Sequence, residues 1–234
     1  MKIYEITMDV FLKKELKLPE SYAYIGKAVA FAFSFSKEEH YSRHYKPYVY
    51  SGMGYVKDKV YKPGNYKIKI RTLEESLVKK IRESETEIMR LTPDTISSAD
   101  FDSFRIPALI TRNPVFFVKK DKKYWVQEDG KEELVKLLIM NGDKKLSFFL
   151  NENGNEHDFI EYVEVLNKYP VCVNYKEKGI RPLGNKMKII FKQDSVSQKI
   201  AKIFFATGVG IKNASLGGGF SEIVAIKSQG GEIC

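Results

Sequence analysis

The order of strand-like and helix-like segments is the feature that most limits how this chain folds. Polar and apolar residues alternate over residues 2–10 and 66–73, as in half-buried strands, whereas apolar residues recur every three or four positions after Leu18, as in an amphipathic helix. The first half therefore predicts a strand at 2–10, a helix from 18, strands at 46–53 and 66–73, a helix at 73–87 and a short strand at 88–91. This order is β-α-β-β-α-β.

The second half predicts the same order, less cleanly, after an irregular stretch at 92–106. Its predicted elements are a leading strand or hairpin at 114–120 and 123–127, a helix at 131–150, strands at 159–166 and 186–192, a helix at 195–207 and a closing strand at 220–226. Two such units predict an α+β fold of tandem ferredoxin-like (RRM-like) βαββαβ domains with antiparallel sheets, at residues 1–107 and 108–234. No residue-level repeat relates the halves, so the duplication is inferred from element order alone.

The composition excludes several classes of protein. With 43% hydrophobic residues among 234, the chain has enough apolar surface for one large or two small cores and is not expected to be disordered. The longest apolar run, 28–33, is far shorter than the ~18 residues of a membrane span, and we expect a cytoplasmic protein. Two cysteines, Cys172 and Cys234, and three histidines exclude a disulfide framework and a Cys/His zinc site, so no metal or cofactor is expected.

The positive charge is concentrated in two segments. The chain has 39 Lys and Arg against 30 Asp and Glu, a net charge of +9. Residues 37–71 carry nine basic and three acidic side chains, and residues 168–192 carry seven and one, so each segment has a net charge of +6. The first segment also holds seven of the fourteen tyrosines. Cations interleaved with aromatic rings suit single-stranded RNA, although a solvated basic strand face with tyrosines packed at its edge explains the same pattern.

A glycine-rich segment at 208–219 follows the last predicted helix. It holds five glycines in twelve residues, but it lacks the Gly-Lys-Ser/Thr ending of a P-loop, and Asn213 stands where the dinucleotide fingerprint needs its third glycine. Glycines at this density permit close approach and positive φ, and their N–H groups can bind phosphate oxygens. The alternative, a glycine that only ends the helix after Thr207, accounts for Gly208 and not for the rest.

Three stretches together resemble the Cas6 family of CRISPR RNA-processing endoribonucleases. The loop has the pattern Gly-x-Gly, Lys-Asn, then Gly-x-Gly-Phe near the C-terminus, as in the glycine-rich loop of that family. Residues 18–24 (Leu-Pro-Glu-Ser-Tyr-Ala-Tyr) resemble the start of its first helix, and residues 46–52 (Lys-Pro-Tyr-Val-Tyr-Ser-Gly) resemble its Lys-x-Phe-Thr-Phe-Ser strand, with tyrosines in place of the phenylalanines and valine in place of threonine. The three stretches occur in family order and span essentially the whole chain.

The resemblance implies a metal-independent reaction and places its catalytic residues. In that family the ribose 2′-OH attacks the adjacent phosphate and leaves a 2′,3′-cyclic phosphate and a 5′-OH, often with a histidine between the first helix and the second strand. His40 best matches that position, and His44 competes with it because it lies two residues before Lys46. Imidazole suits both proton transfers, Lys46 would stabilise the transition state, and Tyr24 or Tyr22 would reach the scissile phosphate unless both only cap an apolar face.

The same resemblance implies CRISPR repeat RNA as the partner, with effector-complex subunits as further partners and a monomer or homodimer as the assembly. Predicted RNA-binding residues lie in the second basic segment and in the glycine-rich loop: Lys176, Lys178, Arg181, Lys186, Lys188, Gly208, Gly210, Lys212, Asn213, Gly217 and Gly219. His157 is interpreted as a surface histidine without a role. A non-catalytic RNA-binding module is the alternative function, and a small-molecule enzyme finds little support because no paired carboxylates or nucleophile elbow are present.

Overall fold

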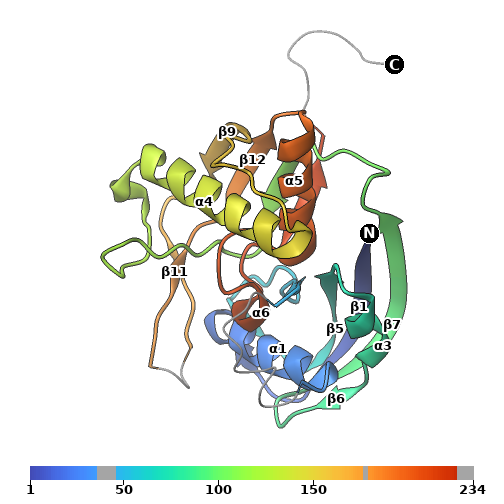
Figure 1. Ribbon diagram of the computed structural model, residues 1–234. Coiled ribbons are helices and arrows are strands. Elements are labelled where there is room, and N and C mark those ends of the chain that lie inside the picture. The colour runs from blue at the N-terminus through green and yellow to red at the C-terminus, as the bar shows by residue number, and fades with distance from the viewer. Residues whose placement is uncertain (36–45, 176–178, 226–234) are drawn as a thin grey trace.

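The first half of the chain forms one antiparallel sheet with a helix packed on it. The structure, a computed structural model, describes residues 1–35, 46–175 and 179–225. Its first sheet has the strand order β3-β5-β1-β7-β6, so that β7-β1-β5-β3 is the order of a ferredoxin-like unit (Figure 1). The elements are β1 (Lys2–Leu12), α1 (Leu18–Ala32), β3 (Tyr48–Tyr50), β5 (Gly64–Thr72), α3 (Glu75–Lys80), β6 (Ser84–Glu85) and β7 (Met89–Asp100). We call them the N-terminal unit.

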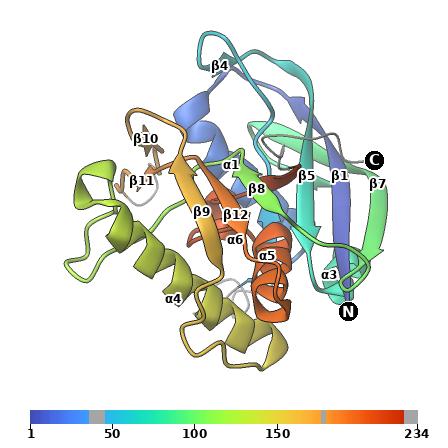
Figure 2. The same cartoon turned by 90° about the horizontal axis from the view of Figure 1, so that it is seen from above.

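The second half repeats this topology. Its sheet has the order β13-β8-β12-β9, with every neighbouring pair antiparallel. Seen from above, α4 and α5 lie side by side on one face of this sheet (Figure 2). The elements are β8 (Ala108–Thr111), α4 (Lys131–Leu150), β9 (Ile160–Val165), β12 (Met187–Phe191), α5 (Ser195–Thr207) and β13 (Ser221–Val224). We call them the C-terminal unit. The predicted tandem ferredoxin-like α+β fold is confirmed, whereas the division after Pro107 stays a prediction.

Short elements extend the two units. One ribbon pairs β2 (Leu16–Lys17) with β4 (Val60–Tyr61), and a second pairs β10 (Val171–Cys172) with β11 (Leu183–Gly184). A 3₁₀ turn, η1, spans Gln127–Asp129, and α6 spans Asn213–Leu216 within the glycine-rich segment. Within the described ranges, no helix has the length and apolar character needed to span a membrane.

Side-chain periodicity explains the strands and helices that were predicted correctly. Along β1, Ile6, Met8 and Val10 are buried toward α1, and the residues between them face away from it. Helix α1 begins with a proline in its first turn and an acidic residue after it, both favourable at a helix N-terminus, and it buries Ile25 and Val29 against the sheet. Helices α4 and α5 have the bounds that the periodicity predicted.

Two predictions in the first half were wrong. The helix predicted at 73–87 ends at Lys80, because the chain then returns to the sheet edge as β6, where the Ser84 hydroxyl donates to the carbonyl oxygen of Ala28 (2.9 Å). The stretch predicted to be irregular from residue 92 continues instead as β7 to Asp100. Pro93 is accommodated in this strand by a bulge, visible as a register shift against Thr7 and Met8.

The leading strand of the second half was also predicted in the wrong place. It is β8, only four residues long, and it lies between β12 and β13. Residues 114–127 form no regular hairpin; a single bridge joins Val118 to Tyr124. A four-residue buried strand has no alternation long enough to be recognised in the sequence.

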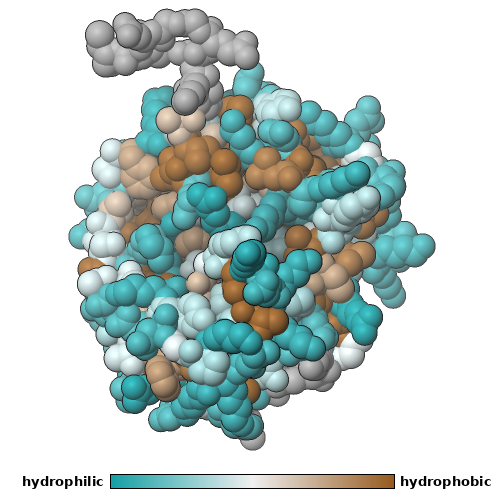
Figure 3. Space-filling view, turned by 180° about the vertical axis from the view of Figure 1, so that it is seen from behind, coloured by the Kyte–Doolittle hydropathy of each residue, from teal (hydrophilic) through white to brown (hydrophobic). Residues whose placement is uncertain are grey.

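Each unit has its own core, and a small third cluster lies between them. Tyr22 of α1, Phe116, Val173 and Leu216 of α6 make up this cluster. Hydrophilic side chains cover most of the face seen in Figure 3, and apolar side chains gather in its upper half, where the C-terminal unit lies.

Candidate nucleic-acid interface

The glycine-rich segment is packed between the two units. It runs from α5 to β13 and carries α6, which lies over α1 (Figure 1). All five of its glycines are buried. A Cβ atom at Gly210 would lie 2.7 Å from the carbonyl oxygen of Phe116, and one at Gly217 would overlap the carbonyl oxygen of Tyr50. Both glycines also have positive φ, so the close approach and the backbone conformation each require glycine.

Most N–H groups of this segment bond within the protein. The N–H groups of Gly208, Gly218 and Gly219 donate to the carbonyl oxygens of Phe204 (2.8 Å), Lys212 (3.2 Å) and Pro114 (2.9 Å), respectively. That of Gly210 donates to Asn141 Oδ1 (2.9 Å). The expectation that these glycines offer free N–H groups to phosphate is therefore wrong for these four. The RNA contacts predicted for Gly208, Gly210, Gly217 and Gly219 stay predictions.

Lys145 of α4 fixes this segment from inside the C-terminal unit. It is 1% exposed, and its Nζ donates to Asn213 Oδ1 (3.0 Å), to Thr207 Oγ1 (3.3 Å) and to the carbonyl oxygens of Thr207 and Gly208. Burial lowers the pKa of this amine to about 7. The Asn213 amide donates in turn to the carbonyl oxygens of Val209 and Gly218 (3.1 and 2.6 Å). Asn213, predicted to contact RNA, thus uses its side chain internally, and that contact stays a prediction.

Asn113 joins the segment to the N-terminal unit. It is 2% exposed, and its Nδ2 donates to the carbonyl oxygens of Tyr50 (2.9 Å) and Gly217 (2.8 Å) while its Oδ1 accepts from the Gly52 N–H (3.1 Å). Two stretches that the sequence singled out separately, 46–52 and 208–219, are therefore bonded through one side chain. Sequence reasoning missed Asn113 because a single asparagine before a proline carries no motif.

Arg71 of β5 forms a second connection between the two units. It lies on the sheet face opposite α1, where it pairs with Glu5 (2.7 Å) and donates to the carbonyl oxygen of Ser221 in the C-terminal unit. Its guanidinium carbon lies 3.8 Å from the ring centroid of Phe205 and 4.3 Å from that of Phe220. Burial alone would raise the pKa of Glu5, but the Lys69 hydrogen bond and the Arg71 charge outweigh it and lower that pKa.

Most of the described tyrosines of the first basic segment belong to the core. Tyr48, Tyr50 and Tyr61 are at most 1% exposed, and the Tyr50 hydroxyl donates to the carbonyl oxygen of Tyr22 (2.7 Å). Tyr55 alone among the described tyrosines of this segment is fully exposed. Tyr41 and Tyr45 lie outside the described residues. The interpretation that these tyrosines form a packed strand edge holds for the buried ones.

Two of the four predicted catalytic residues can be placed. His40 and His44 lie outside the described residues. Lys46 follows directly, with its Nζ 5.3 Å from the ring centroid of Phe35. Tyr24 lies half-buried on α1, against the core of the N-terminal unit. Its neighbour Tyr22 is buried, which raises its pKa to about 12 and keeps its hydroxyl protonated at neutral pH.

The RNA-binding residues predicted in the second basic segment (residues 168–192) lie in two different places. Lys176 and Lys178 lie outside the described residues. Arg181 is exposed beside β11, on the arm formed by β10 and β11, which is bonded to α1 by the Asn174 N–H and the carbonyl oxygen of Pro19 (2.8 Å). Lys186 is half-buried, with a pKa lowered by burial and by the nearby charge of Arg112.

Two further predicted contacts lie away from that arm. Lys188 lies within the C-terminal sheet, opposite Glu164 and Ile110. Lys212 lies half-buried at the start of α6 with φ 64°. The RNA contacts predicted for both lysines stay predictions.

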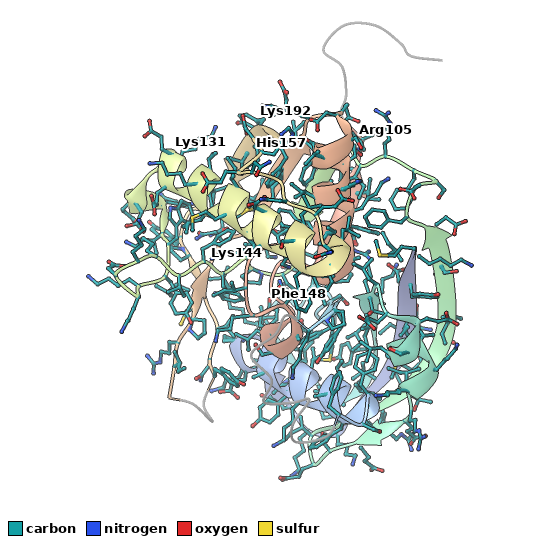
Figure 4. All side chains as sticks on the ribbon, viewed as in Figure 1. Arg105, Lys131, Lys144, Phe148, His157 and Lys192 are labelled. Atoms are coloured by element: carbon teal, nitrogen blue, oxygen red, sulfur yellow. The ribbon has the colours of Figure 1, made fainter. Side chains whose placement is uncertain are left out.

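His157 has a structural contact. Its Nε2 lies 3.0 Å from Asp194 Oδ1 and 3.1 Å from Ser197 Oγ, so it ties the loop after α4 to the start of α5 (Figure 4). Asp194 also caps α5 by accepting from the Ser197 N–H (2.9 Å). In the part of the chain that the structure describes, no three His, Cys, Asp or Glu side chains form a group that could hold a metal ion.

Comparison with known proteins gives matches in structure and not in sequence. No protein-family model matches the sequence, and a search of curated proteins gives no match. A CRISPR-associated protein Cas6 superposes with a TM-score of 0.65 at 17% identity, over 95% of this chain and 100% of the other. A protein described as an RAMP protein binding different RNA substrates gives 0.69 at 14% identity, over 96% and 100%. A Cas6 product complex gives 0.61 at 13% identity, over 95% and 100%.

The chain has the Cas6 fold. The likeness to these structures extends over both units, since at least 95% of the chain is matched in each of the three cases. The topology that the sequence predicted from element order is thus the topology of solved Cas6 and RAMP proteins.

Proposed function

We propose that this chain is a Cas6-family endoribonuclease that binds CRISPR repeat RNA and cuts it within the repeat. The observation that carries the proposal is the whole-chain match to Cas6 structures, one of them a product complex. The two basic segments, each with a net charge of +6, support an RNA partner because phosphate neutralisation dominates such binding. Residues 1–107 and 108–234 would be its two domains.

The proposed reaction uses residues of the first half of the chain. The ribose 2′-OH attacks the adjacent phosphate, forming the cyclic phosphate as the bond to the 5′ oxygen breaks. His40, or else His44, would take the 2′-OH proton or protonate the leaving 5′ oxygen, because imidazole titrates near neutral pH. Lys46 would stabilise the charge on the non-bridging oxygens, and Tyr24 would position the phosphate.

The glycine-rich segment has a positioning part in this proposal. Its internal bonds through Asn113 and Lys145 hold β3 and α1 against the C-terminal unit. The segment 36–45, which carries both candidate histidines, joins these two elements in the chain. Because α1 and β3 are held in place against the C-terminal unit, both ends of the catalytic segment would have a fixed position relative to RNA bound by that unit.

The decisive experiment is cleavage of a CRISPR repeat RNA in EDTA, with analysis of the product ends. We expect a 2′,3′-cyclic phosphate and a 5′-OH, and no cleavage when the scissile nucleotide carries a 2′-deoxy sugar. Cleavage of the deoxy substrate, or a requirement for metal, would contradict the proposed mechanism. His40→Ala is expected to lower the rate by about 10²–10⁴-fold, with His44→Ala as the competing variant. His157→Ala, whose contact is with the start of α5, is the control.

A second function is favoured by one observation. The RAMP protein with a TM-score of 0.69 is described by its binding of different RNA substrates and not by cleavage. A non-catalytic repeat-binding protein, or a subunit of a CRISPR effector complex, would bind the same RNA and return it intact. Binding without turnover, unchanged by either histidine substitution, would replace the first proposal with this one.

A further inference from the structure

Tyr55 differs from the other described tyrosines of its segment in being almost completely exposed. Tyr55 is 93% exposed, whereas Tyr48, Tyr50 and Tyr61 are at most 1% exposed. Among the described residues it makes no ring contact or side-chain hydrogen bond. Covering an exposed aromatic ring with an apolar or π surface is energetically favourable. An exposed ring on an ordered loop therefore calls for an explanation.

The loop that carries Tyr55 is anchored on both sides of it. Met53, two residues before, is 6% exposed in the core of the N-terminal unit. The buried Tyr61 donates its hydroxyl to the carbonyl oxygen of Gly54 (2.6 Å), the residue directly before Tyr55. The Gly52 N–H is bonded to Asn113, which also holds the glycine-rich segment. The ring is thus presented from a fixed base, and little conformational entropy is lost when a ligand covers it.

Three exposed lysines lie on the same loop as Tyr55 or on the strand paired with its end. Lys57 and Lys59 are exposed on the same loop, and Lys17 is exposed on β2, paired with Val60 of β4. None of the three lysines forms an ion pair with another described residue. The Lys59 carbonyl oxygen accepts from the Leu18 N–H (2.8 Å), so the loop and the start of α1 form one surface. The loop therefore carries an exposed aromatic ring and lysines without an ion-pair partner among the described residues, with one exposed acid, Asp58, between Lys57 and Lys59.

We propose that Tyr55 is a stacking platform for an unpaired base of single-stranded RNA, with Lys57, Lys59 and Lys17 at the backbone phosphates on either side. The proposal rests on the RNA binding proposed above and names a contact within it. Any base can stack on a tyrosine ring, and lysine binds phosphate as a point charge. This surface would therefore bind RNA without sequence specificity. A protein partner would need a broader apolar surface than one ring among cations.

The arrangement extends the RNA path beyond the arm of the C-terminal unit. Asn174 of that arm is bonded to Pro19 at the start of α1, and the carbonyl oxygen of Lys59 accepts from Leu18 beside it. RNA bound at the arm would therefore continue onto the Tyr55 loop along the start of α1. The unpaired nucleotides that flank a bound repeat segment are the natural occupants of this surface.

The test measures binding of a labelled 20-nucleotide RNA of mixed, unstructured sequence by the full chain and its variants across a salt series. Tyr55→Ala is expected to weaken binding about tenfold, and Tyr55→Phe, which keeps the ring, by less than about twofold. The salt dependence separates the two kinds of contact. Tyr55→Ala should leave the slope of log K against log salt unchanged, whereas the double variant Lys57→Gln/Lys59→Gln should reduce it by about 1.4. Tyr162→Ala, at a 45% exposed tyrosine of β9, is the matched control and should bind as the unaltered chain does.

The outcomes distinguish this inference from the proposed function. If the unaltered chain does not bind this unstructured RNA, the stacking platform is contradicted, whereas the proposed function is contradicted only by a failure to bind and cut repeat RNA. If it binds and Tyr55→Ala binds equally well, only the stacking platform is contradicted. An equal loss in Tyr55→Ala and Tyr162→Ala also contradicts it, because the effect is then not local. If RNA binding is unchanged in Tyr55→Ala but its oligomeric state shifts, the ring is a protein contact instead. Because Tyr55 packs on no described residue, its variants are expected to fold.

Discussion

The two units share one strand order and build it from opposite proportions of strand and helix. The N-terminal unit has strands of 11, 9 and 12 residues in β1, β5 and β7, and its second helix, α3, has six residues. The C-terminal unit has strands of four to six residues and helices of 20 and 13. The difference matters at their junction. The face of the N-terminal sheet away from α1 receives Phe205 of α5 and Phe220, with Arg71 between them.

Neither unit is complete without the other. The C-terminal unit supplies the glycine-rich segment that packs on β3 and α1, and the N-terminal unit supplies the buried cation that holds the start of β13. Substitutions on either side of these contacts between the units are expected to have different effects, and each has a control on the same element or with the same backbone conformation.

The largest effect is expected from the C-terminal side of these contacts. Gly217 and Gly179 both have φ +61°, but a Cβ at Gly217 would overlap the carbonyl oxygen of Tyr50, whereas one at Gly179 meets nothing within 4 Å. Gly217→Ala should lower the free energy of unfolding by at least ~3 kcal/mol, and Gly179→Ala by about 1 kcal/mol, the cost of the backbone conformation alone. Urea unfolding measures both. Equal losses would mean that the close approach costs nothing.

The next effect comes from the N-terminal side. Arg71→Met leaves Glu5 without its buried partner and removes the bond to Ser221, so the free energy of unfolding should fall by about 3 kcal/mol. Lys67→Met, on the same strand but with exposed partners in Asp9 and Asp94, should cost less than about 1 kcal/mol. Chemical unfolding of each variant is the measurement. A similar small loss in both would show that Arg71 does not join the units.

The smallest effect is a pH dependence inside the C-terminal unit. The pKa of Lys145 is lowered from 10.5 to about 7 in the folded chain, so between these values the unfolded chain binds more protons than the folded one. The free energy of unfolding should therefore rise with pH from 7.5 to 9.5, by up to about 1.4 kcal/mol per pH unit relative to Lys145→Met. Lys144→Met, at the exposed neighbouring lysine, should show the same pH profile as the unaltered chain. Parallel profiles for Lys145→Met and the unaltered chain would contradict the lowered pKa.

The sequence predicted elements well where the evidence for them is local. Helices α4 and α5 have the predicted bounds because each has an apolar face that repeats over three or more turns. The extension of β7 past Pro93 was missed, because a bulge opposite Thr7 accommodates that proline and the bulge depends on a strand some 85 residues away in the chain. For the same reason β8 was missed, since its four residues are a strand only through their pairing with β12 and β13.

In the candidate site, too, the features with local evidence in the sequence were predicted, and those that depend on distant residues were not. The glycine-rich segment was recognised from its composition, but its bonding was not, because the groups that occupy its N–H donors are Pro114, Phe116 and Asn141 from other parts of the chain. The residues that connect the two units, Asn113 and Arg71, belong to no motif. The placement of His40 and His44 stays a prediction.

Two properties of this protein followed from its sequence alone: the order of elements in two βαββαβ units, and the concentration of positive charge in two segments. Both are sums over neighbouring residues, so no knowledge of distant contacts is needed to obtain them. The tertiary structure decided which tyrosines enter the core and which stay exposed, which glycines meet another backbone, and which lysines are buried. Those outcomes depend on partners that tertiary packing brings together from distant parts of the chain, and local periodicity carries no information about such partners.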